Sequence, residues 1–510
     1  MMPSHVPLAN GRAQHAKPGG TGRYQHRDAQ IAGSLFVGTL LIYAAVSRYK
    51  YVAYDAASMV GLAHTLVNHL SLNAGQGFDD YLHLSTPYSP YGIGLSLVIA
   101  PIYGLSKLTG HENILLSFIN PCIMSMTVVV SYAIGRALRW GASWAVLCAA
   151  TFGILTMALQ ATTELFSEPA VALCVAVLIW AILRWSAGWK YAPIVIGLTA
   201  GAVIQFRADS ILTVWIGLLA VPLFVPWRQV MRIPVLVAVG IPTTISLCLL
   251  GAYNNLRWHS PLVFSYNGEG FQIPLGRGLE GLLFSPGKSF FLYNPIAILG
   301  VIGIVTLLWT RKPVGVLFLL LIIPRFIFFA KWESWEGGVD WGPRFLFPIV
   351  LLFVIGAVDV LVQTRRRSLI AVCARVAFVG LALFGLGVNY LSVRVPYEQW
   401  YSVVASPSLS SAFDGGKPFV SNPTAVGAVG NAYDFTYRAS QIRGDLDLLE
   451  SHRAQDALVV FVAHPRLAWA MLSAGSGFLL LAAIAAFDLD WTLKRKGQSE
   501  VESPELSDTV

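Results

Sequence analysis

Residues Trp332 to Pro348 have the sequence Trp-Glu-Ser-Trp-Glu-Gly-Gly-Val-Asp-Trp-Gly-Pro-Arg-Phe-Leu-Phe-Pro and lie between two long apolar runs. One run ends near Phe329 and the next begins at Phe345, so the stretch connects two predicted membrane spans. It contains three tryptophans, three acids, three glycines and Arg344. An ionisable group at the edge of a span is costly and indicates a functional site. An aromatic belt with an arginine that reaches toward the lipid headgroups would also explain these residues, so both interpretations stay open here.

The composition indicates a polytopic helical membrane protein. Hydrophobic residues make up 55% of the 510 residues and charged residues only 12%, whereas a soluble globular protein carries roughly twice that charged fraction. The net charge of +8 comes from lysines and arginines in short clusters between apolar runs. That pattern is typical of cytoplasmic membrane loops and argues against a nucleic-acid partner. All five cysteines lie in apolar runs, which argues against a disulfide framework or a metal site: Cys122, Cys148, Cys174, Cys248 and Cys373.

The apolar runs predict an all-α fold with about 12 transmembrane helices, or about 13 if residues 93–108 cross the membrane. Pro101 and the small residues of that run favour a re-entrant or surface helix instead. The long first external loop, 47–92, contains a helical pattern at 57–72 that suits a helix on the membrane surface. The runs are 31–46, 93–108, 113–135, 142–160, 169–184, 191–206, 211–226, 233–253, 290–309, 314–330, 345–362, 368–391 and 467–487.

Basic clusters recur after every second predicted span and assign those loops and the carboxyl terminus to the cytoplasm. The amino terminus is also cytoplasmic if residues 93–108 do not cross the membrane fully. The clusters are Arg136/Arg139, Arg184/Lys190, Arg228/Arg232, Arg311/Lys312, Arg365 to Arg367 and Lys494 to Lys496. The predicted external loops are then 47–112, 160–168, 206–210, 254–289, 331–344 and 392–466. Because most of the remaining charged residues fall in these loops, the working face is expected to point outward at membrane level.

The chain divides into five predicted parts. Residues 1–28 are polar and are expected to form a disordered cytoplasmic tail, and residues 489–510 form a second cytoplasmic tail. Residues 29–391 form the transmembrane module, which includes the external loop 47–92. Residues 392–466 form an external soluble segment and residues 467–488 the last transmembrane helix. Loops beyond about 15 residues are usually functional or separately folded, so the external segment could cap the site.

Two acids are the candidates for general-base chemistry. Asp55 follows the first span within about nine residues, and Glu168 opens a later span with Glu164 one helical turn before it. A carboxylate at the bilayer edge can accept the proton of an attacking hydroxyl. The alternatives are a helix cap for Asp55 and a first-turn acid for Glu168, which Pro169 follows at the start of the helix.

Several cations are predicted near the outer face: Arg207, Lys288, Arg325, Lys331 and Arg344. This many cations on the outer side runs against the usual charge asymmetry of membrane proteins, and a ligand that carries phosphate would explain the excess. Pairing with the neighbouring acids of residues 333–340 is the alternative. A carboxylate together with phosphate-binding cations fits transfer of a sugar from a polyprenyl phosphate to a hydroxyl. Composition alone would equally allow a transporter.

Four segments resemble the GT-C superfamily of polytopic glycosyltransferases, in the bacterial branch related to protein O-mannosyltransferases and the lipid A aminoarabinose transferase. The first is Tyr54-Asp55 through the turn Ser-Thr-Pro-Tyr-Ser-Pro-Tyr-Gly that begins at Ser85, and the second is Ser167-Glu-Pro. The third is Gly-Leu-Leu-Phe-Ser-Pro-Gly-Lys-Ser-Phe-Phe-Leu-Tyr-Asn-Pro at 281–295, and the fourth is Trp-Glu-Gly-Gly-Val-Asp-Trp-Gly-Pro-Arg-Phe-Leu-Phe-Pro at 335–348. The resemblance extends over residues 31 to 391.

The resemblance implies an inverting transferase that uses a polyprenyl-phosphate sugar, with Asp55 as the base and Glu168 as a supporting acid or a metal or acceptor contact. The residues expected to bind the donor phosphate are Lys288, Arg344, Arg207 and Arg325. Those expected around the substrate pocket are Tyr54, Tyr88, Tyr91, Glu164, Trp335 and Trp341. Aminoarabinose transferases carry a lysine before the turn proline where this chain has Thr86-Pro87 and Tyr88-Ser-Pro, so phosphate contacts in that loop are not implied.

The expected partners are the lipid-linked sugar donor, membrane lipids and an acceptor that is a glycan, a lipid or a protein. The expected location is a bacterial inner (plasma) membrane, with several spans and the active site facing outside. Asp79 and Asp80 could bind a divalent metal ion, although no motif requires one. A transporter or flippase for a lipid-linked or anionic substrate is the alternative function, although no internal repeat of the kind found in transporters is evident. A non-catalytic assembly subunit is a third alternative, which the retention of both acids disfavours.

Overall fold

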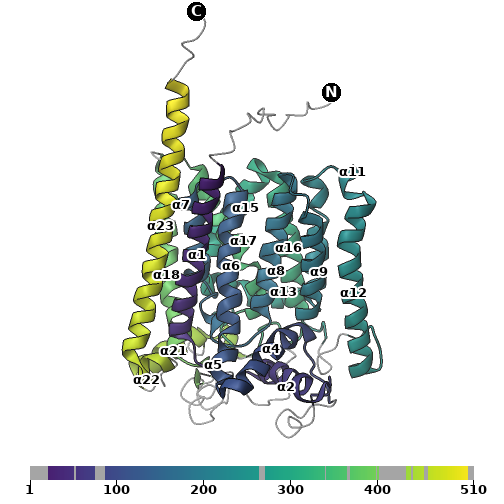
Figure 1. The fold of residues 1–510 in the computed structure, drawn as a ribbon. Coiled ribbons are helices and arrows are strands. Elements are labelled where there is room, and N and C mark those ends of the chain that lie inside the picture. Colours follow the sequence, from purple (N-terminus) through teal and green to yellow (C-terminus); the bar gives the residue numbers. More distant parts are fainter. Residues whose placement is uncertain are drawn as a thin grey trace, which may run out of the picture.

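The structure is a computed structural model of an all-α, multi-pass membrane protein (Figure 1). It describes residues 21–50, 53–74, 87–263, 270–338, 340–364, 368–397, 399–400, 432–437, 440–452 and 458–502. Within these ranges, eight helical segments are long and apolar enough to cross a membrane. They are α1 (Thr21–Val46), α5 with α6 (Glu112–Ser117 and Ile119–Ala137), α8 (Glu168–Ser186), α12 (Ile233–Trp258), α16 (Lys312–Lys331), η3 with α17 (Arg344–Ile349 and Val350–Gln363), α18 (Leu369–Arg394) and α23 (Pro465–Glu502).

Five shorter apolar helices complete the set that the sequence predicts. They are α4 (Ile93–Thr109), α7 (Ala142–Leu155), α9 (Ala192–Phe206), α10 (Ser210–Leu218, extended by η2 at Val221–Leu223) and α15 (Ile296–Thr310). The all-α polytopic fold is therefore confirmed, and every predicted apolar run contains a helix. The run at 93–108 forms α4, which packs on α2 (Tyr54–His69), on α5 and on the end of α9. Figure 1 shows α4 beside α2 at one end of the bundle, as expected for a surface or re-entrant helix.

Two ends of the bundle can be distinguished in Figure 1. The start of α1, the end of α23 and α11 (Trp227–Val230) lie at one end, and α11 and the residues beside it carry Arg228 and Arg232. The helices α2, α5, α21 (Gln441–Glu450) and α22 (Val459–Ala463) lie at the opposite end. Arg228 and Arg232 thus lie at the end of the bundle opposite α2.

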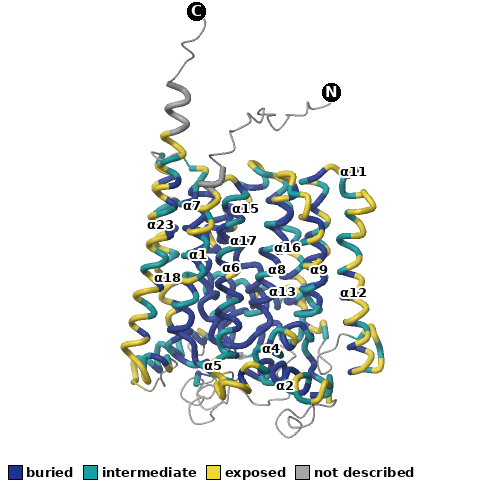
Figure 2. Tube along the Cα trace, viewed as in Figure 1, coloured by how far each residue is buried: buried dark blue, intermediate teal, exposed yellow. Residues whose placement is uncertain are grey.

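Close backbone packing joins α15 to α17 in the centre of the molecule, where Figure 2 shows mostly buried residues. A methyl group added at Gly303 would lie 1.9 Å from the carbonyl oxygen of Gly356, and one at Gly300 would lie 2.3 Å from that of Phe353. Only glycine permits such an approach between two helices. In contrast, α12, α18 and α23 expose apolar side chains along much of their length, as expected of helices that face lipid.

The structure corrects the predicted terminal boundaries. Helix α1 begins at Thr21 rather than near Ile31, so part of the expected disordered tail is helical. Polar partners on neighbouring helices explain the extension: Arg27 lies 2.9 Å from Asp488, and Asp28 accepts a hydrogen bond from the hydroxyl of Tyr132. At the other end of the chain, α23 continues through the predicted tail to Glu502. There Asp490 accepts hydrogen bonds from the first backbone N–H groups of α7.

Three further differences lie near the end of the bundle that carries α2. The run at 290–309 is broken by Asn294 and Pro295 into α14 (Phe290–Tyr293) and α15, because proline cannot donate a helical hydrogen bond. The loop 254–289 contains an additional helix, α13 (Leu275–Phe284), and the loop 160–168 contains η1 (Gln160–Thr162). Within the predicted external segment 392–466, the structure describes three short helices: η5 (Ala432–Phe435), α21 and α22.

Candidate active site

Arg344 is the centre of a cluster of three acids from three parts of the chain. Its Nη1 donates a hydrogen bond to Oδ2 of Asp55 at 2.8 Å and lies 3.9 Å from Oε1 of Glu168. Its Nε donates to the carbonyl oxygen of Gly337 at 2.7 Å and lies 3.2 Å from Oδ2 of Asp340. The Arg344 side chain is 12% exposed, so it borders the surrounding space while most of it is desolvated. Arg344 is therefore a cation inside the protein and not a membrane anchor that reaches toward water.

Arg207 forms the second cationic group of the site. Its Nη1 donates to Oε1 of Glu168 at 2.6 Å, and its Nε and Nη2 lie 2.8 and 2.7 Å from Oδ2 of Asp209. Arg207 and Arg344 thus share Glu168, and both guanidiniums lie over the ring of Phe345, at 4.9 and 5.0 Å from its centroid. Shared partners fix the two cations relative to each other.

Asp55 is held at both carboxylate oxygens. Oδ2 accepts from Arg344 and Oδ1 accepts from the hydroxyl of Tyr91 at 2.7 Å. Burial alone would raise the pKa of Asp55, but Arg344, the Tyr91 hydroxyl and Arg207 together hold it below its ordinary value. The residue is the second of α2, whose N-cap is Ala53 with no side-chain bond. The capping role considered from the sequence is therefore not what the structure shows, and Asp55 is an ionised acceptor directed at the cavity.

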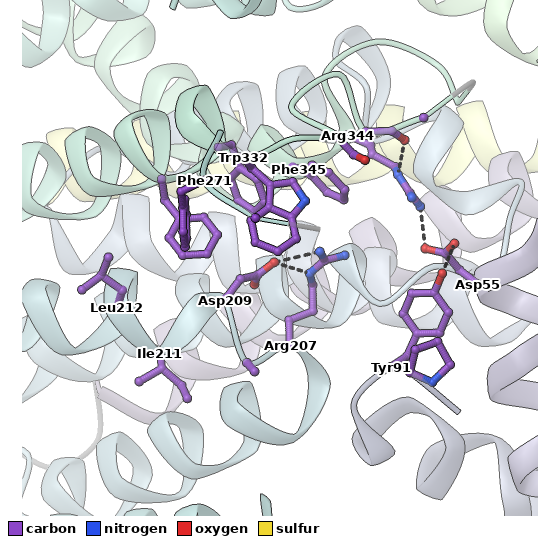
Figure 3. A pocket seen from close by; sticks show the side chains of 18 residues that line it. Asp55, Tyr91, Arg207, Asp209, Ile211, Leu212, Phe271, Trp332, Arg344 and Phe345 are labelled. Carbon is purple, nitrogen blue, oxygen red and sulfur yellow. Dashed lines mark hydrogen bonds and ion pairs between the residues drawn. The ribbon is translucent and has the colours of Figure 1, made fainter. Parts of the chain in front are cut away.

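A cavity of about 680 Å³ connects these charged groups to an apolar wall. Figure 3 shows Asp55, Tyr91 and Arg344 on one side, Arg207 and Asp209 in the middle, and an aromatic and aliphatic surface on the other side. The apolar wall consists of Ile211, Leu212, Phe271, Phe328, Phe329 and Trp332. Leu212 and Phe271 are also exposed, at 45% and 52%, so the apolar end reaches the outer surface of the helix bundle. Such a cavity suits a ligand with an anionic head and an apolar tail.

The loop from Trp332 to Pro343 shapes the charged end of the cavity. Gly337 and Gly338 have φ angles of +78° and +76°, which side chains other than glycine adopt only with strain. This turn aims the carbonyl oxygen of Gly337 at Nε of Arg344. The sequence pattern Gly-Gly within the opening stretch is thus explained by the path of the loop around the arginine.

Lys288 lies beneath this loop and not in the cavity wall. Its Nζ is fully buried and donates to the carbonyl oxygens of Gly338, Asp340 and Gly342, at 2.7, 2.6 and 3.3 Å. These bonds use the three donors of an ammonium group. The geometry therefore differs from the expected contact with a donor phosphate and gives Lys288 the position of a residue that holds the loop.

Arg325 also supports the site from behind. Its Nε donates to the carbonyl oxygen of Phe345 at 2.6 Å and its Nη1 to the hydroxyl of Ser210 at 3.2 Å. The side chain is buried within α16 and lies over the ring of Phe329. It is absent from the residues that line the cavity, so it orients the backbone beside Arg344.

Of the six residues expected around the substrate pocket, only Tyr91 lines the cavity. The ring of Tyr54 packs edge-on against the ring of Tyr91, with ring centroids 6.2 Å apart. Tyr88 is half-buried outside the lining. Glu164 pairs with Arg48 at 3.3 Å in a separate buried position.

The two expected tryptophans are fully buried and support the loop rather than line the cavity. Trp335 packs against Phe435 and against the face of α13 at Gly281, and Trp341 packs edge-on against Tyr293. The external segment reaches the same region: Gly287 N–H donates to the carbonyl of Asp434 and Gly342 N–H to the side chain of Gln441. This segment therefore packs against the loop that carries Arg344.

Sequence reasoning missed Asp209, Asp340 and most of the apolar wall as parts of the site. Asp209 follows Arg207 by two residues at the junction of α9 and α10, and that spacing was a usable signal. Phe328, Phe329 and Trp332 recur at helical spacing at the C-terminal end of α16, a pattern shared by any lipid-facing helix. Phe271 belongs to a loop, and its position comes from backbone pairing of Gly270 with Glu333, which no local pattern reveals.

Among the described residues, no group of three or more histidine, cysteine, aspartate or glutamate side chains is arranged to hold a metal ion. The suggested acid pair Asp79 and Asp80 lies outside the residues that the structure describes.

No protein family model and no curated protein matches this chain significantly. Solved structures do show similarity. ArnT from Cupriavidus metallidurans bound to undecaprenyl phosphate matches with 15% identity and a TM-score of 0.47, over 92% of this chain and 77% of ArnT. The Archaeoglobus fulgidus oligosaccharyltransferase matches with 13% identity and a TM-score of 0.41, over 83% and 64% of the two chains. The arabinosyltransferase EmbB from Mycobacterium smegmatis matches with 13% identity and a TM-score of 0.34, over 95% and 42%.

Proposed function

We propose that this protein is a membrane glycosyltransferase that moves a sugar from a polyprenyl-phosphate donor to a hydroxyl acceptor. The observation that carries the proposal is the cavity itself, which has Asp55, Arg344 and Arg207 at one end and an aromatic wall at the other. A lipid phosphate needs both surfaces: cations for the phosphate and apolar side chains for the prenyl chain. The sugar would lie between them and Asp55.

Each charged group has a role in the proposed reaction. The acceptor hydroxyl donates a hydrogen bond to Asp55 and its oxygen attacks the anomeric carbon of the donor. As the bond from that carbon to the phosphate oxygen breaks, the hydroxyl proton passes to Asp55. Attack on the face opposite the leaving phosphate inverts the configuration at the anomeric carbon. The electron pair of the broken bond stays on the lipid phosphate, which the guanidiniums of Arg344 and Arg207 stabilise.

Glu168 supports the two cations in this scheme. Its Oε1 lies 2.6 Å from Arg207 and 3.9 Å from Arg344, so one carboxylate fixes the spacing of the phosphate-binding pair. Lys288 and Arg325 hold the backbone on either side of Arg344 and are positioning residues in the same scheme. The proposal therefore assigns direct phosphate contact to Arg344 and Arg207 alone.

The proposed location is the outer face of a bacterial inner membrane. The site lies at the end of the bundle opposite α11 and the first residues of α1, which carry the basic residues expected in the cytoplasm. A donor with an isoprenoid tail would enter from the bilayer through the exposed apolar end of the cavity. The acceptor is a hydroxyl of a glycan, a lipid or a protein.

A direct test is transfer by the purified full-length protein in lipid nanodiscs, with radiolabelled polyprenyl-phosphate sugars and a panel of acceptors. The expected result is a labelled, inverted product, and a decrease of about 10²- to 10⁴-fold with Asp55→Asn. Asp488→Asn, which alters an exposed carboxylate at the other end of the bundle, is the matched control. Normal expression and full activity of Asp55→Asn would contradict the assignment. Donor movement across liposomes without transfer would favour the flippase instead.

A further inference from the structure

Several acids surround Arg344, and their negative charges would repel a phosphate that binds there. Asp55, Asp340 and Glu168 lie 2.8, 3.2 and 3.9 Å from its guanidinium, and Asp209 lies on the neighbouring Arg207. These four acids face two guanidiniums at the cavity, with Lys288 and Arg325 buried behind them. Two further buried acids, Glu336 and Asp434, lie near Lys288, so the cations have no positive charge to spare before any donor binds. A phosphate that enters this desolvated cluster would leave at least one anion without compensation, which is costly.

Asp340 is the least stabilised of the four carboxylates. Asp55 accepts hydrogen bonds from Arg344 and Tyr91, and Glu168 accepts one from Arg207 at 2.6 Å. Asp209 accepts from Arg207 and from the Ser210 hydroxyl.

The carboxylate of Asp340 has a different set of contacts among the described residues. It lies 3.2 Å from Nε of Arg344, an N–H that already donates to the carbonyl of Gly337. Lys288 binds the backbone oxygen of Asp340 and not its carboxylate. An anion held by one shared donor is the first to be neutralised when more negative charge arrives.

The surroundings of Asp340 also make its carboxylate easier to protonate, because burial and the neighbouring acids outweigh the neighbouring cations. Burial raises the pKa of Asp340 to about 6 against the opposing charge of Arg344; Asp55 and Glu168 add to the rise, and Lys288 opposes it. At neutral pH the side chain is therefore mostly ionised but close to its titration range. A phosphate on the far side of Arg344 would raise this pKa further.

We propose that Asp340 is a proton-linked counter-ion of Arg344, which is ionised when no donor is bound and takes up one proton from solvent when the donor phosphate binds. The inference deepens the proposed function and rests on it, because it names how the same site is regulated. The proton adds to the carboxylate of Asp340, so the net charge of the cluster rises by one as the phosphate arrives. Release of the lipid phosphate returns the proton to solvent.

The test compares wild-type protein with Asp340→Asn, a neutral side chain of the same shape, each full-length and in nanodiscs. The probe is undecaprenyl phosphate, and its Kd is measured near pH 6, 7 and 8. If binding requires a protonated Asp340 with a pKa of about 6, the variant binds about tenfold more tightly at about pH 7 and about a hundredfold at about pH 8. Because the ligand titrates identically in both measurements, its own pKa cancels in the ratio. Glu280→Gln, which changes an exposed acid of α13, is expected to leave the ratio near one.

A second measurement uses wild-type protein alone and does not depend on how the variant folds. The probe is a polyprenyl sulfate, whose headgroup does not titrate near neutral pH. Calorimetry in two buffers with different ionisation enthalpies counts the protons taken up, and close to one is expected at about pH 7 to 8. Equal affinity of both proteins for undecaprenyl phosphate at every pH, or no proton uptake with the sulfate, overturns the inference while leaving the transferase intact. Failure of the wild-type protein to bind either lipid overturns the proposed function itself.

Discussion

Nη1 of Arg344 lies 2.8 Å from Oδ2 of Asp55, although the two residues are 289 positions apart in the chain. One belongs to η3, which leads into a buried membrane helix, and the other to α2 at the end of the bundle. The pair therefore forms only when the surface helix is seated on the membrane module. A carboxylate and a cation fixed at this distance are the parts that a displacement at a phosphate-linked carbon needs.

Substitution Arg344→Lys tests the fork-shaped contacts of this arginine. A lysine keeps the charge but cannot bind Asp55 and the carbonyl of Gly337 together, nor can it contact a phosphate with two N–H groups. We expect transfer to fall about 10- to 100-fold, the cost of one charge-assisted hydrogen bond, with little change in melting temperature. The measurement is kcat and KM for the donor. Arg443→Lys, in a half-buried ion pair with Asp447, is the control, and wild-type kinetics for Arg344→Lys would contradict the assignment.

Substitution Tyr91→Phe tests how Asp55 is kept ionised. Burial raises the pKa of Asp55, and Arg344 and the Tyr91 hydroxyl lower it, so loss of the hydroxyl raises the pKa. Because the reaction needs the carboxylate, activity is lost as pH falls through that pKa. The acid limb of kcat/KM is therefore expected to move to higher pH by up to about one unit. Tyr103→Phe on the neighbouring helix α4 is the matched control, and an unshifted acid limb in Tyr91→Phe would count against the role of its hydroxyl.

Substitution Lys288→Met distinguishes between two roles of this lysine, support of the loop and direct contact with the donor phosphate. Loss of the ammonium leaves three buried carbonyl groups without their donor, and we expect a loss of about 3 kcal/mol or more of stability. The melting temperature should fall together with activity. A raised donor KM with an unchanged melting temperature would instead show direct phosphate contact. Lys331→Met, at the exposed end of α16, controls for the loss of a positive charge near the site.

Substitution Asp434→Asn tests the contact between the external segment and the loop. Burial raises the pKa of Asp434 to about 7 and Lys288 opposes the rise, so the folded protein binds this proton more tightly than the unfolded chain. Its stabilising contribution is complete below about pH 4 and is lost as pH rises toward about 7. The melting temperature of the wild-type protein should therefore fall over this range by several degrees more than that of Asp434→Asn.

The half-buried Asp447→Asn is the matched control for Asp434, since it removes a carboxylate from the same segment. It should follow the wild-type pH dependence. Parallel melting curves for the wild type and Asp434→Asn would show that Asp434 does not titrate between pH 4 and 7.

Much of the fold could be predicted because a bilayer imposes a simple rule on sequence. Runs of roughly 20 apolar residues become helices, and each predicted run contains one. The helix boundaries were harder to predict. The break at Asn294 and Pro295 lies inside a continuous apolar run, and the extension of α1 to Thr21 depends on partners from α6 and α23.

The site was only partly predictable for a related reason. Asp55, Arg207 and Arg344 stand out because charges at the edge of apolar runs are rare, and all three line the cavity. The position of Lys288 could not be inferred, because the same charge suits a phosphate or three carbonyl groups. The second outcome depends on the path of a loop about fifty residues later in the chain.

The glycine contact between α15 and α17 has a mechanical consequence. These helices follow directly after the two segments that matter most: Lys288 precedes α14 and α15, and Arg344 begins the turn into α17. Since Gly303 and Gly356 bring the backbones together, neither helix can slide along the other. The contact between α15 and α17 thereby fixes the position of Lys288 relative to Arg344 along the helix axes. A thinner or thicker bilayer would tilt or shift this pair as a unit, and the distances around the arginine would stay the same.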